Sequence, residues 1–353
     1  MATSLWPFPP PITPMEAKVR TELPAPPGWA YEPKWDGFRC LAWGGKTASG
    51  APEAVTARLD SRNTRPLLRY FPELLPALAQ LPVDAVVDGE VVLVTDGRTD
   101  FDALQQRIHP AESRITMLAR ETPAELVAFD LLALGGDDLR AAGFSERRRR
   151  LTELLEGLEQ PWHLTPSTTD VQVGARWFDE FESAGCDGIV AKQLDGRYVE
   201  GERAMVKVKH RRTADTVIGG YRLHKEGDRI GSLLLGLFNS AGELHFIGHC
   251  SGFGNADRVT LLERLRRYEV DTSFGEDARR PGEPSRWSAG KDLAWVAVRP
   301  ELVCEVSYDQ LTGDRFRHAT RFERWRPDKE PSECLLDQLE RPQGSDFGDV
   351  VVS

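Results

Sequence analysis

Apolar and polar residues alternate along several short stretches of the chain, with a period of two. Between Phe38 and Trp43, one set of alternate positions is entirely apolar. Successive side chains of a strand lie on opposite faces, so this run predicts a strand. Lys34 is then expected in a short turn just before that strand. Further apolar runs predict strands at residues 55–59, 85–94, 125–132 and 205–209.

Apolar residues at helical spacing predict four helices in the first two hundred residues. The clearest begins at Ser145, which can cap a helix, and Leu151, Leu154 and Leu158 follow on one side. The four arginines at 147–150 are interpreted as a solvated face of this helix rather than a nucleic-acid patch. Residues 1–30 are expected to be an irregular lead-in, because they are rich in proline. The other three helices are predicted at residues 71–81, 101–108 and 171–184.

The pattern changes after residue 212, where short alternating runs take over. Runs at 216–223, 230–238 and 244–250 are followed by one helix at 255–268 and by strands near 295–298 and 302–308. About five strands with one helix are typical of a small OB barrel. We therefore predict a first domain over residues 1–212, an OB-fold domain over residues 213–335 and a disordered tail over residues 336–353.

Composition and charge narrow the class of protein. The chain has 353 residues, of which 40% are apolar, and this is enough for two domains. It has neither an apolar run near 18 residues nor a signal peptide, so we expect no membrane span and no membrane partner. Five scattered cysteines without a CxxC pair favour reduced thiols in the cytoplasm and argue against a zinc site. The net charge of −10 argues against a nucleic-acid coat protein but allows an enzyme with a basic stripe.

Three places in the sequence carry candidate chemistry. Lys34 can act as a nucleophile once it loses its proton, although the same stretch also suits a charged surface turn. Asp88 and Glu90 interrupt a buried strand, and burying a carboxylate is costly unless it binds something. Lys207 and Lys209 alternate along a strand and so face the same site, where they suit a polyphosphate and are expected to lower the pKa of Lys34.

The stretch from Lys34 to Arg39, Lys-Trp-Asp-Gly-Phe-Arg, resembles the KxDGxR signature of the covalent nucleotidyltransferases. This family contains DNA ligases, RNA ligases and mRNA capping enzymes. Six further stretches resemble the family's other motifs, in the same order, within residues 15–335, and chance does not produce such an order. The two-domain chain looks like the short bacterial ATP-dependent DNA ligases of the LigC type. The six stretches are 60–63, 88–90, 129–130, 187–192, 205–209 and 321–329.

The resemblance implies that Lys34 attacks the α-phosphate of ATP and carries AMP as a phosphoramidate. It also implies a site for Mg²⁺ (or Mn²⁺) at Asp187 and Glu90, where Asp187 replaces the Glu that most DNA ligases carry. Glu32 would accept a hydrogen bond from the adenine amine, and Phe129 would stack on the purine. The other nucleotide contacts implied are Arg39, Arg62, Glu90, Arg203, Lys207 and Lys209.

For the second domain, the resemblance implies that Arg326, Asp328 and Lys329 contact the leaving pyrophosphate in the first step only. Arg62, Arg211 and Arg212 would bind DNA. The implied fold is α+β: an ATP-grasp-like nucleotidyltransferase domain, with antiparallel sheets and flanking helices, followed by a β-rich OB-fold domain. The implied partner is nicked double-stranded DNA, sealed by a monomer in the bacterial cytoplasm.

Three alternatives stay open at the level of sequence. A capping-type guanylyltransferase shares the lysine motif and often begins motif IV with Asp, so nucleotide choice separates it from a ligase. RNA-strand joining is the second, because the motifs do not exclude it. A non-catalytic OB-fold module that binds nucleic acid is the third, and the intact Lys34, Lys207 and Lys209 argue against it.

Overall fold

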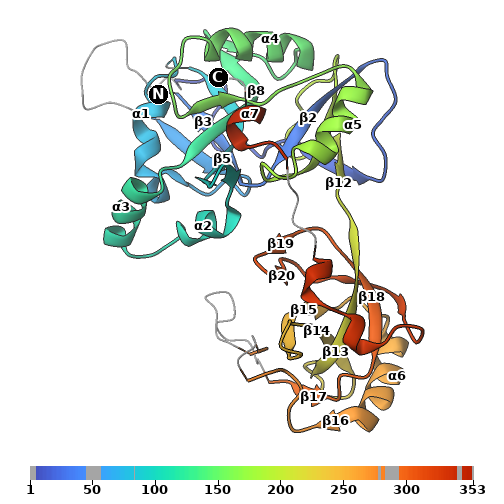
Figure 1. Ribbon diagram of the computed structural model, residues 1–353. Coiled ribbons are helices and arrows are strands. Elements are labelled where there is room, and N and C mark those ends of the chain that lie inside the picture. The colour runs from blue at the N-terminus through green and yellow to red at the C-terminus, as the bar shows by residue number, and fades with distance from the viewer. Residues whose placement is uncertain are drawn as a thin grey trace. The chain divides into compact units, whose positions relative to one another are not determined.

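The computed structural model describes residues 5–44, 57–82, 84–276, 280–282, 294–339 and 344–351. The chain divides into two compact units, each described below by itself (Figure 1). The first contains Met1–Lys209 together with Pro342–Ser353, and the second contains His210–Arg341. None of the helices in the described ranges has the length and apolar composition of a membrane span.

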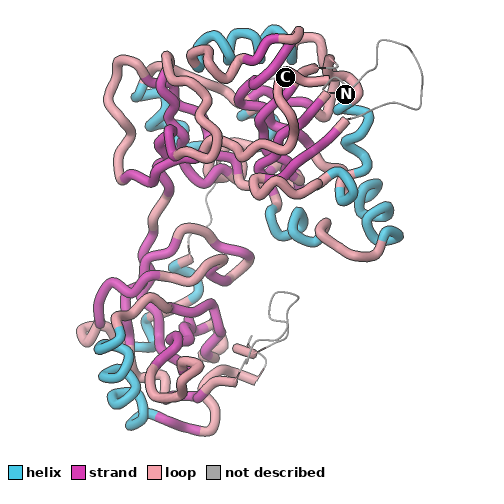
Figure 2. The backbone as a smooth tube through the Cα atoms, turned by 180° about the vertical axis from the view of Figure 1, so that it is seen from behind, coloured by secondary structure: helices cyan, strands magenta, loops and turns pink. Residues whose placement is uncertain are grey.

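Two sheets form the centre of the first unit, with helices at its periphery (Figure 2). The four-stranded sheet has the order β1-β12-β11-β2, and the larger sheet has the order β10-β8-β5-β3-β4 with β9 beside β8. β6 and β7 form a separate hairpin. The strands are β1 (Glu16–Arg20), β2 (Trp29–Trp35), β3 (Phe38–Trp43), β4 (Arg58–Ser61), β5 (Val86–Val92), β6 (Val94–Thr95), β7 (Arg98–Thr99), β8 (Glu125–Leu134), β9 (Asp137–Asp138), β10 (Trp162–Leu164), β11 (Cys186–Gln193) and β12 (Arg203–Lys209).

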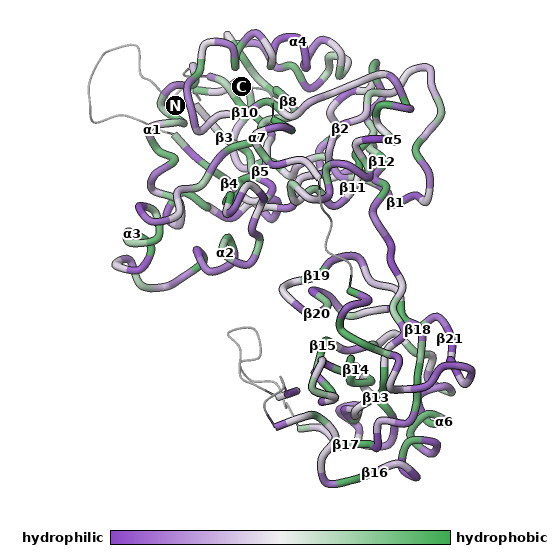
Figure 3. Tube along the Cα trace, viewed as in Figure 1, coloured by the Kyte–Doolittle hydropathy of each residue, from purple (hydrophilic) through white to green (hydrophobic). Residues whose placement is uncertain are grey.

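Apolar side chains cover both faces of the larger sheet, and the strands carry the most hydrophobic residues (Figure 3). On one face they pack against helices and against 3-10 turns at 68–70 and 72–74; on the other face lie Trp6, Phe8 and Ile12 of the N-terminal lead-in. This packing fixes the strands that carry the candidate residues. The helices of the unit are α1 (Leu75–Leu78), α2 (Phe101–Gln106), α3 (Glu112–Glu121), α4 (Phe144–Leu155), α5 (Val171–Glu180) and α7 (Phe347–Val350).

The second unit is a closed β barrel. β13 pairs with β14 along one edge and with β17 and β18 along the other, while β14 pairs with β15 and β18 with β21. A parallel bridge between Cys250 and Thr320 joins β15 to the start of β21, which closes the ring of five strands. One helix lies between the third and fourth strands of the ring, as in an OB fold. The elements are β13 (Arg212–Leu223), β14 (Ile230–Phe238), β15 (Leu244–Cys250), α6 (Asn255–Leu265), β16 (Glu269–Val270), β17 (Val296–Val298), β18 (Val303–Tyr308), β19 (Leu311–Thr312), β20 (Arg315–Phe316) and β21 (Arg321–Trp325).

Several predicted elements differ from those observed at the start of the chain. The strand predicted from Phe38 is confirmed as β3, but Lys34 lies within β2 and not in a turn. The irregular lead-in contains β1 and the first residues of β2, because strands need only one neighbour with free backbone groups and tolerate prolines nearby. The strand predicted at 55–59 falls partly outside the described residues.

The prediction of a disordered tail from residue 336 is wrong for the described part of that segment. Residues 336–338 form a 3-10 turn in the second unit, where the Gln338 side chain hydrogen-bonds the backbone of Asp215 at 3.0 and 3.1 Å. Residues 344–351 belong to the first unit, where Phe347 and Val350 are buried. The acidic composition concealed these apolar side chains, which bury enough surface to order the segment.

Candidate active site

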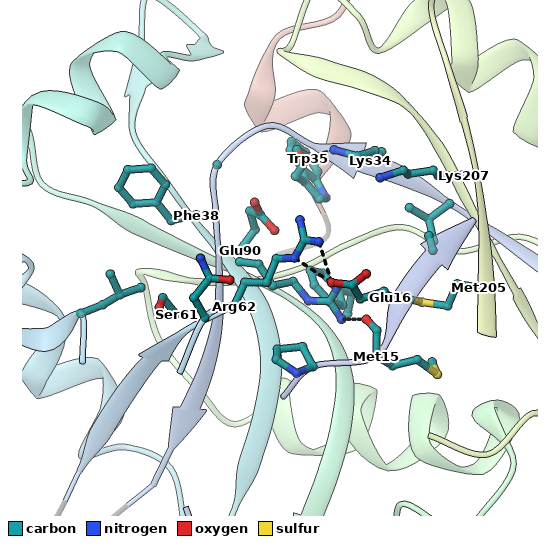
Figure 4. Close-up of a pocket in the computed structure, with 18 of the residues that line it drawn as sticks. Met15, Glu16, Lys34, Trp35, Phe38, Ser61, Arg62, Glu90, Met205 and Lys207 are labelled. Carbon is teal, nitrogen blue, oxygen red and sulfur yellow. Dashed lines mark hydrogen bonds and ion pairs between the residues drawn. The ribbon is translucent and has the colours of Figure 1, made fainter. Parts of the chain in front are cut away.

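The two sheets of the first unit line a cavity of about 880 Å³ (Figure 4), within the size range of ligand pockets. β1, β2, β11 and β12 contribute from the smaller sheet, and β3, β4, β5 and β8 from the larger one. Of the residues expected to contact a nucleotide, Arg203 alone is absent from the lining. The expected residues that line the cavity are Glu32, Lys34, Arg39, Arg62, Glu90, Phe129, Lys207 and Lys209.

The amine of Lys34 lies beside the carboxylate of Asp187. Lys34 Nζ is 2.9 Å from Asp187 Oδ1, and Lys209 Nζ is 2.7 Å from Asp187 Oδ2, so this carboxylate bridges two lysines. The turn after Lys34 passes close to β5, where a Cβ on Gly37 would lie 2.3 Å from Val91 O. Glycine is therefore required for the chain to turn here and to bring Lys34 to the cavity.

The pKa of Lys34 differs from the expectation. Burial acts to lower it, but the charges of Asp187, Glu90 and Asp36 outweigh burial, and the net pKa is raised above the ordinary value for lysine. The predicted lowering by Lys207 and Lys209 is wrong for the ligand-free chain, because Lys209 is paired with Asp187. Burial, followed by the charges of Lys34 and Lys209, lowers the pKa of Lys207 instead.

Asp187 is placed by an irregular part of its strand. The β2–β11 ladder loses its register between Cys186 and Ile189, and such bulges re-aim side chains next to sites. Gly188 has a φ of +145°, and a Cβ there would lie 2.0 Å from Val208 O. Only glycine fits, and the Asp-Gly pair turns the Asp187 carboxylate towards the lysines. Apart from the Lys34 ammonium, Asp187 Oδ1 has no hydrogen-bond partner among the described residues.

The two acids of β5 have separate surroundings. Asp88 is fully buried and accepts hydrogen bonds from Arg39 Nε (2.7 Å), Arg39 Nη2 (2.6 Å) and the Tyr198 hydroxyl (2.6 Å). Asp88 thus orients Arg39, whose guanidinium lies 4.9 Å from the centre of the Phe129 ring. Glu90 instead faces the cavity (Figure 4), and burial raises its pKa to about 8 against the opposing charges of Lys34 and Arg39.

Glu32 is held by two cations that sequence reasoning did not assign to the site. Its Oε2 lies 2.8 Å from Lys192 Nζ, and its Oε1 lies 3.4 Å from Arg148 Nη1. Lys192 also donates to the backbone oxygen of Phe129 at 2.8 Å and lies 4.8 Å from the centre of that ring. The signal was present for Lys192, because it follows Val190 and Ala191 in a buried strand, like the acids of β5.

The interpretation of 147–150 as a solvated face holds only for part of that run. Arg147 is fully buried, and it donates to Asp130 at 2.7 and 3.1 Å and to the backbone of Ala142 and Gly196. Arg149 is exposed and pairs within its own helix. Arg147 lies four residues before Leu151 and shares its buried face, which is the spacing that could have identified it. Together with Asp130, Arg147 supports the residues around Glu32.

The charged residues around Glu32 and Lys34 form two groups of five. The Glu32 cluster consists of Glu32, Asp130, Arg147, Arg148 and Lys192. The Lys34 cluster consists of Lys34, Glu90, Asp187, Lys207 and Lys209. No group of three or more His, Cys, Asp or Glu side chains in the described parts of the chain is arranged to hold a metal ion by protein ligands alone.

At the exposed edge of the cavity, Glu16 of β1 joins two of the arginines expected to bind phosphates. Arg62 donates to Glu16 Oε1 at 2.5 and 3.1 Å, and Arg203 donates to Glu16 Oε2 at 3.4 Å (Figure 4 shows the Arg62 contact). Both guanidiniums are largely exposed. They can therefore reach a ligand beyond the cavity mouth once Glu16 releases them.

The remaining expected residues belong to the second unit. Arg211 bonds Ser307 and Glu323, and Arg212 begins β13. Arg326 Nη1 donates to Asp215 at 2.8 and 2.9 Å, and Arg326 Nη2 donates to Asp328 at 2.9 Å, which lowers the pKa of Asp328 to about 2. The second unit thus carries a set of charges fixed by ion pairs within that unit.

Comparison with known proteins identifies the family. The ATP dependent DNA ligase domain matches residues 14–209, and the ATP dependent DNA ligase C terminal region matches residues 226–329. DNA ligase C of Mycobacterium tuberculosis is 48% identical over 98% of this chain and 98% of its own. DNA ligase C2 of Mycolicibacterium smegmatis is 48% identical over 95% of this chain and 96% of its own. A solved Lig E DNA ligase shares the fold at a TM-score of 0.55 and 16% identity, covering 89% of this chain and 100% of that one. The chain therefore belongs to the ATP-dependent DNA ligase family.

Proposed function

We propose that Lys34 is the residue through which this ATP-dependent DNA ligase takes AMP from ATP and passes it to the 5′-phosphate of a nick. The 3′-hydroxyl then displaces AMP and closes the phosphodiester bond. The observation that carries this proposal is the Lys34 amine at the cavity wall, 2.9 Å from Asp187 and on the same cavity as Lys207 and Lys209. Each transfer needs an aligned nucleophile and neutralised phosphate charge, which such a wall of cations provides.

The surroundings of Asp187 and Glu90 fit a divalent cation. Mg²⁺ is commonly held by one or two carboxylates and completed by substrate phosphates. Asp187 Oδ1 lacks a hydrogen-bond donor apart from Lys34, and Glu90 is buried with a raised pKa, so both carboxylates would gain from a cation. When bound, the metal would neutralise phosphate charge. Lys207 and Lys209 contribute to the same task from β12.

The Glu32 cluster supports the choice of adenine. Glu32 is anchored by Lys192 and Arg148, so its carboxylate is available as an acceptor and cannot donate. An acceptor suits the amine of adenine, whereas guanine presents an oxygen at the corresponding position and would meet it without a hydrogen. Phe129 lines the same cavity and offers a ring face on which a purine can stack.

The second unit is proposed to act with the first during self-adenylation. Arg326, Asp328 and Lys329 would contact the leaving pyrophosphate, and the unit would then turn to DNA, about a hinge at residues 211–213. A double variant, Asp328→Ala with Lys329→Ala, is expected to slow adduct formation while sparing the sealing of nicks that already carry a 5′-adenylate. Equal losses in the two half-reactions would exclude a role limited to the first step.

Nicked duplex DNA is the proposed partner of a monomeric, cytoplasmic enzyme. Arg62 and Arg203 on the first unit, and Arg211 and Arg212 on the second, are proposed to meet its phosphates. The cytoplasmic assignment is supported by the cysteines, because all five are buried free thiols.

The test is incubation with labelled ATP or GTP, followed by nicked duplexes with DNA or RNA on each side of the nick. We expect a covalent adduct from ATP and sealing of the nick with DNA on both sides. An adduct from GTP alone would indicate a capping-type enzyme, and preference for an RNA 3′-hydroxyl would indicate an RNA ligase. Failure to form any adduct would leave nucleic-acid binding as the function.

A further inference from the structure

The C-terminal segment, residues 344–351, packs into the first unit, although it follows the whole β-rich unit in sequence (Figure 1). Phe347, Val350 and Val351 are buried in one apolar cluster with Trp35, Val92, Val127, Phe181, Ala184 and Cys186. The Phe347 ring lies between two aromatic rings, with its centre 5.3 Å from that of Trp35 and 5.3 Å from that of His163. The segment is therefore part of the core of the first unit.

Polar contacts fix the direction of this segment. The backbone N–H of Phe347 donates to Gly97 O in the β6–β7 hairpin, and Ser183 Oγ donates to Ser345 O at 2.7 Å. The side chains of Asp346 and Asp349 cap the short helix α7 reciprocally. Close approach at Gly97, where a Cβ would lie 2.8 Å from Asp346, leaves little room for the segment to shift. Phe347 is thus directed at one place in the core.

That place is next to the catalytic residues in sequence. Trp35 directly follows Lys34, and Cys186 directly precedes Asp187. Trp35 and Cys186 lie opposite each other in the β2–β11 ladder. Both side chains pack with Phe347 in one cluster, while the neighbouring Lys34 lines the cavity and pairs with Asp187.

The backbone ladder alone does not fix this pair. The register between β2 and β11 is lost between Cys186 and Ile189, so regular strand pairing does not determine where Asp187 lies. Trp35 is held by a hydrogen bond from Nε1 to Thr165 Oγ1 at 2.8 Å and by the Phe347 ring. Packing against Phe347 is consequently a main restraint on the ends of both strands.

We propose that Phe347 is a positioning residue, through which the C-terminal segment holds Lys34 and Asp187 in the geometry needed for attack on ATP. The proposal rests on Lys34 being the nucleophile. A misplacement of a reacting group by about 1 Å costs on the order of 100-fold in rate. Loss of the Phe347 ring should therefore lower the rate of adduct formation at saturating ATP more than it raises the KM for ATP, because Glu32 and Phe129 lie outside its cluster.

The variants are Phe347→Ala, Phe347→Leu and a matched control, Leu78→Ala. Leu78 is fully buried in a different apolar cluster, on the far side of the larger sheet from the C-terminal segment's contacts. Its truncation lowers stability without touching Trp35 or Cys186. Phe347→Leu keeps most of the side-chain volume, so it is expected to fold and to lose less activity than Phe347→Ala.

Three measurements are made on the full chain: the thermal midpoint, the rate of adduct formation against ATP concentration, and hydrogen exchange of peptides 29–37 and 184–190. We expect Phe347→Ala to slow the saturated rate by about 10-fold to 100-fold and to speed exchange in both peptides. Leu78→Ala, compared at a loss of thermal midpoint equal to that of Phe347→Ala, should change neither the saturated rate nor the exchange rates by more than about twofold. Equal effects of Phe347→Ala and Leu78→Ala would overturn the proposal. A wild-type chain without an ATP adduct would instead overturn the assignment of Lys34.

Discussion

The Glu32 cluster and the Lys34 cluster both contribute residues to the lining of one cavity, but they hold their charges differently. In the Glu32 cluster each cation is also bonded to backbone oxygens: Lys192 to Phe129, Arg148 to Thr165 and Arg147 to Ala142 and Gly196. In the Lys34 cluster, Lys34 reaches a backbone oxygen only at 3.5 Å, and Asp187 Oδ1 lacks a hydrogen bond from a neutral donor. In the first cluster every cation has both a carboxylate and a backbone oxygen as partners, whereas in the second Asp187 Oδ1 has only the Lys34 ammonium among the described residues.

Under the proposed function, this difference separates the residues that would recognise the base from those that would act in nucleotidyl transfer. A buried network with every member bonded is rigid and specific, which suits selection of a base. Charges that repel one another or lack partners bind favourably to a group that neutralises them. Such a cluster suits the binding of phosphates and a metal ion. Substitutions in the Glu32 cluster should therefore cost stability first, and those in the Lys34 cluster should cost activity first.

The largest effect is expected at Lys34, the proposed nucleophile. Lys34→Arg keeps the charge beside Asp187, but a guanidinium stays protonated and cannot attack the α-phosphate. Adduct formation should fall below detection, while nicks already carrying a 5′-adenylate are still sealed. Unfolding should change little. A labelled adduct on the Lys34→Arg chain would show that another residue is the nucleophile.

A second test compares two substitutions of Asp187, one that removes the carboxylate and one that lengthens the side chain. Asp187→Ala removes the carboxylate that bridges Lys34 and Lys209, and adduct formation should fall by roughly 100-fold, as for loss of a preorganised electrostatic partner. Asp187→Glu keeps a hard oxygen ligand and should lose about tenfold or less. The rates of adduct formation of the two variants are compared at limiting Mg²⁺. Normal ligation by Asp187→Ala under that condition would contradict the assignment.

Stability distinguishes the two clusters most directly. Lys192→Met leaves the buried Glu32 and Asp130 without a shared cation, and breaking such a pair lowers the free energy of unfolding by about 3–5 kcal/mol. Lys207→Met removes a cation whose neighbours repel it, so the free energy of unfolding should stay within about 1 kcal/mol of wild type. Denaturant unfolding of both variants measures the difference. Equal losses of unfolding free energy in the two variants would mean that the two clusters contribute alike to stability.

The smallest effect concerns DNA binding at the rim of the cavity. The logarithm of affinity for a nicked duplex should fall linearly with the logarithm of salt concentration, and Arg62→Ala should reduce that slope by about 0.9. Arg149→Ala is the matched control, since Arg149 is exposed but paired with Glu146 and Glu153 in α4. An unchanged slope in Arg62→Ala would remove Arg62 from the interface.

Sequence periodicity predicted those elements in which apolar residues recur at regular short spacing. β3, β8, α4 and α6 follow from short-range patterns, and the structure confirms each with small shifts of the ends. β2 was missed because Glu32 and Lys34 interrupt its apolar run, and their cost is offset by partners more than 100 residues away. Such pairing is invisible to a local pattern.

The candidate site was predicted from motif resemblance, which supplied residue types but not their partners. It indicated Glu32, yet the cations that hold Glu32 come from β11 and α4, and their pairing requires the tertiary fold. The raised pKa of Lys34 likewise depends on the sum of three carboxylates brought together by different strands. A sequence gives the sign of each charge, but the summed electrostatic effect on the pKa depends on the distances between the charges.

The return of the chain to the first unit has a mechanical consequence. The β-rich unit is inserted between β12 and α7, so it is attached covalently at two points rather than one. A single proteolytic cut in either connection would therefore leave the two units joined covalently through the other connection.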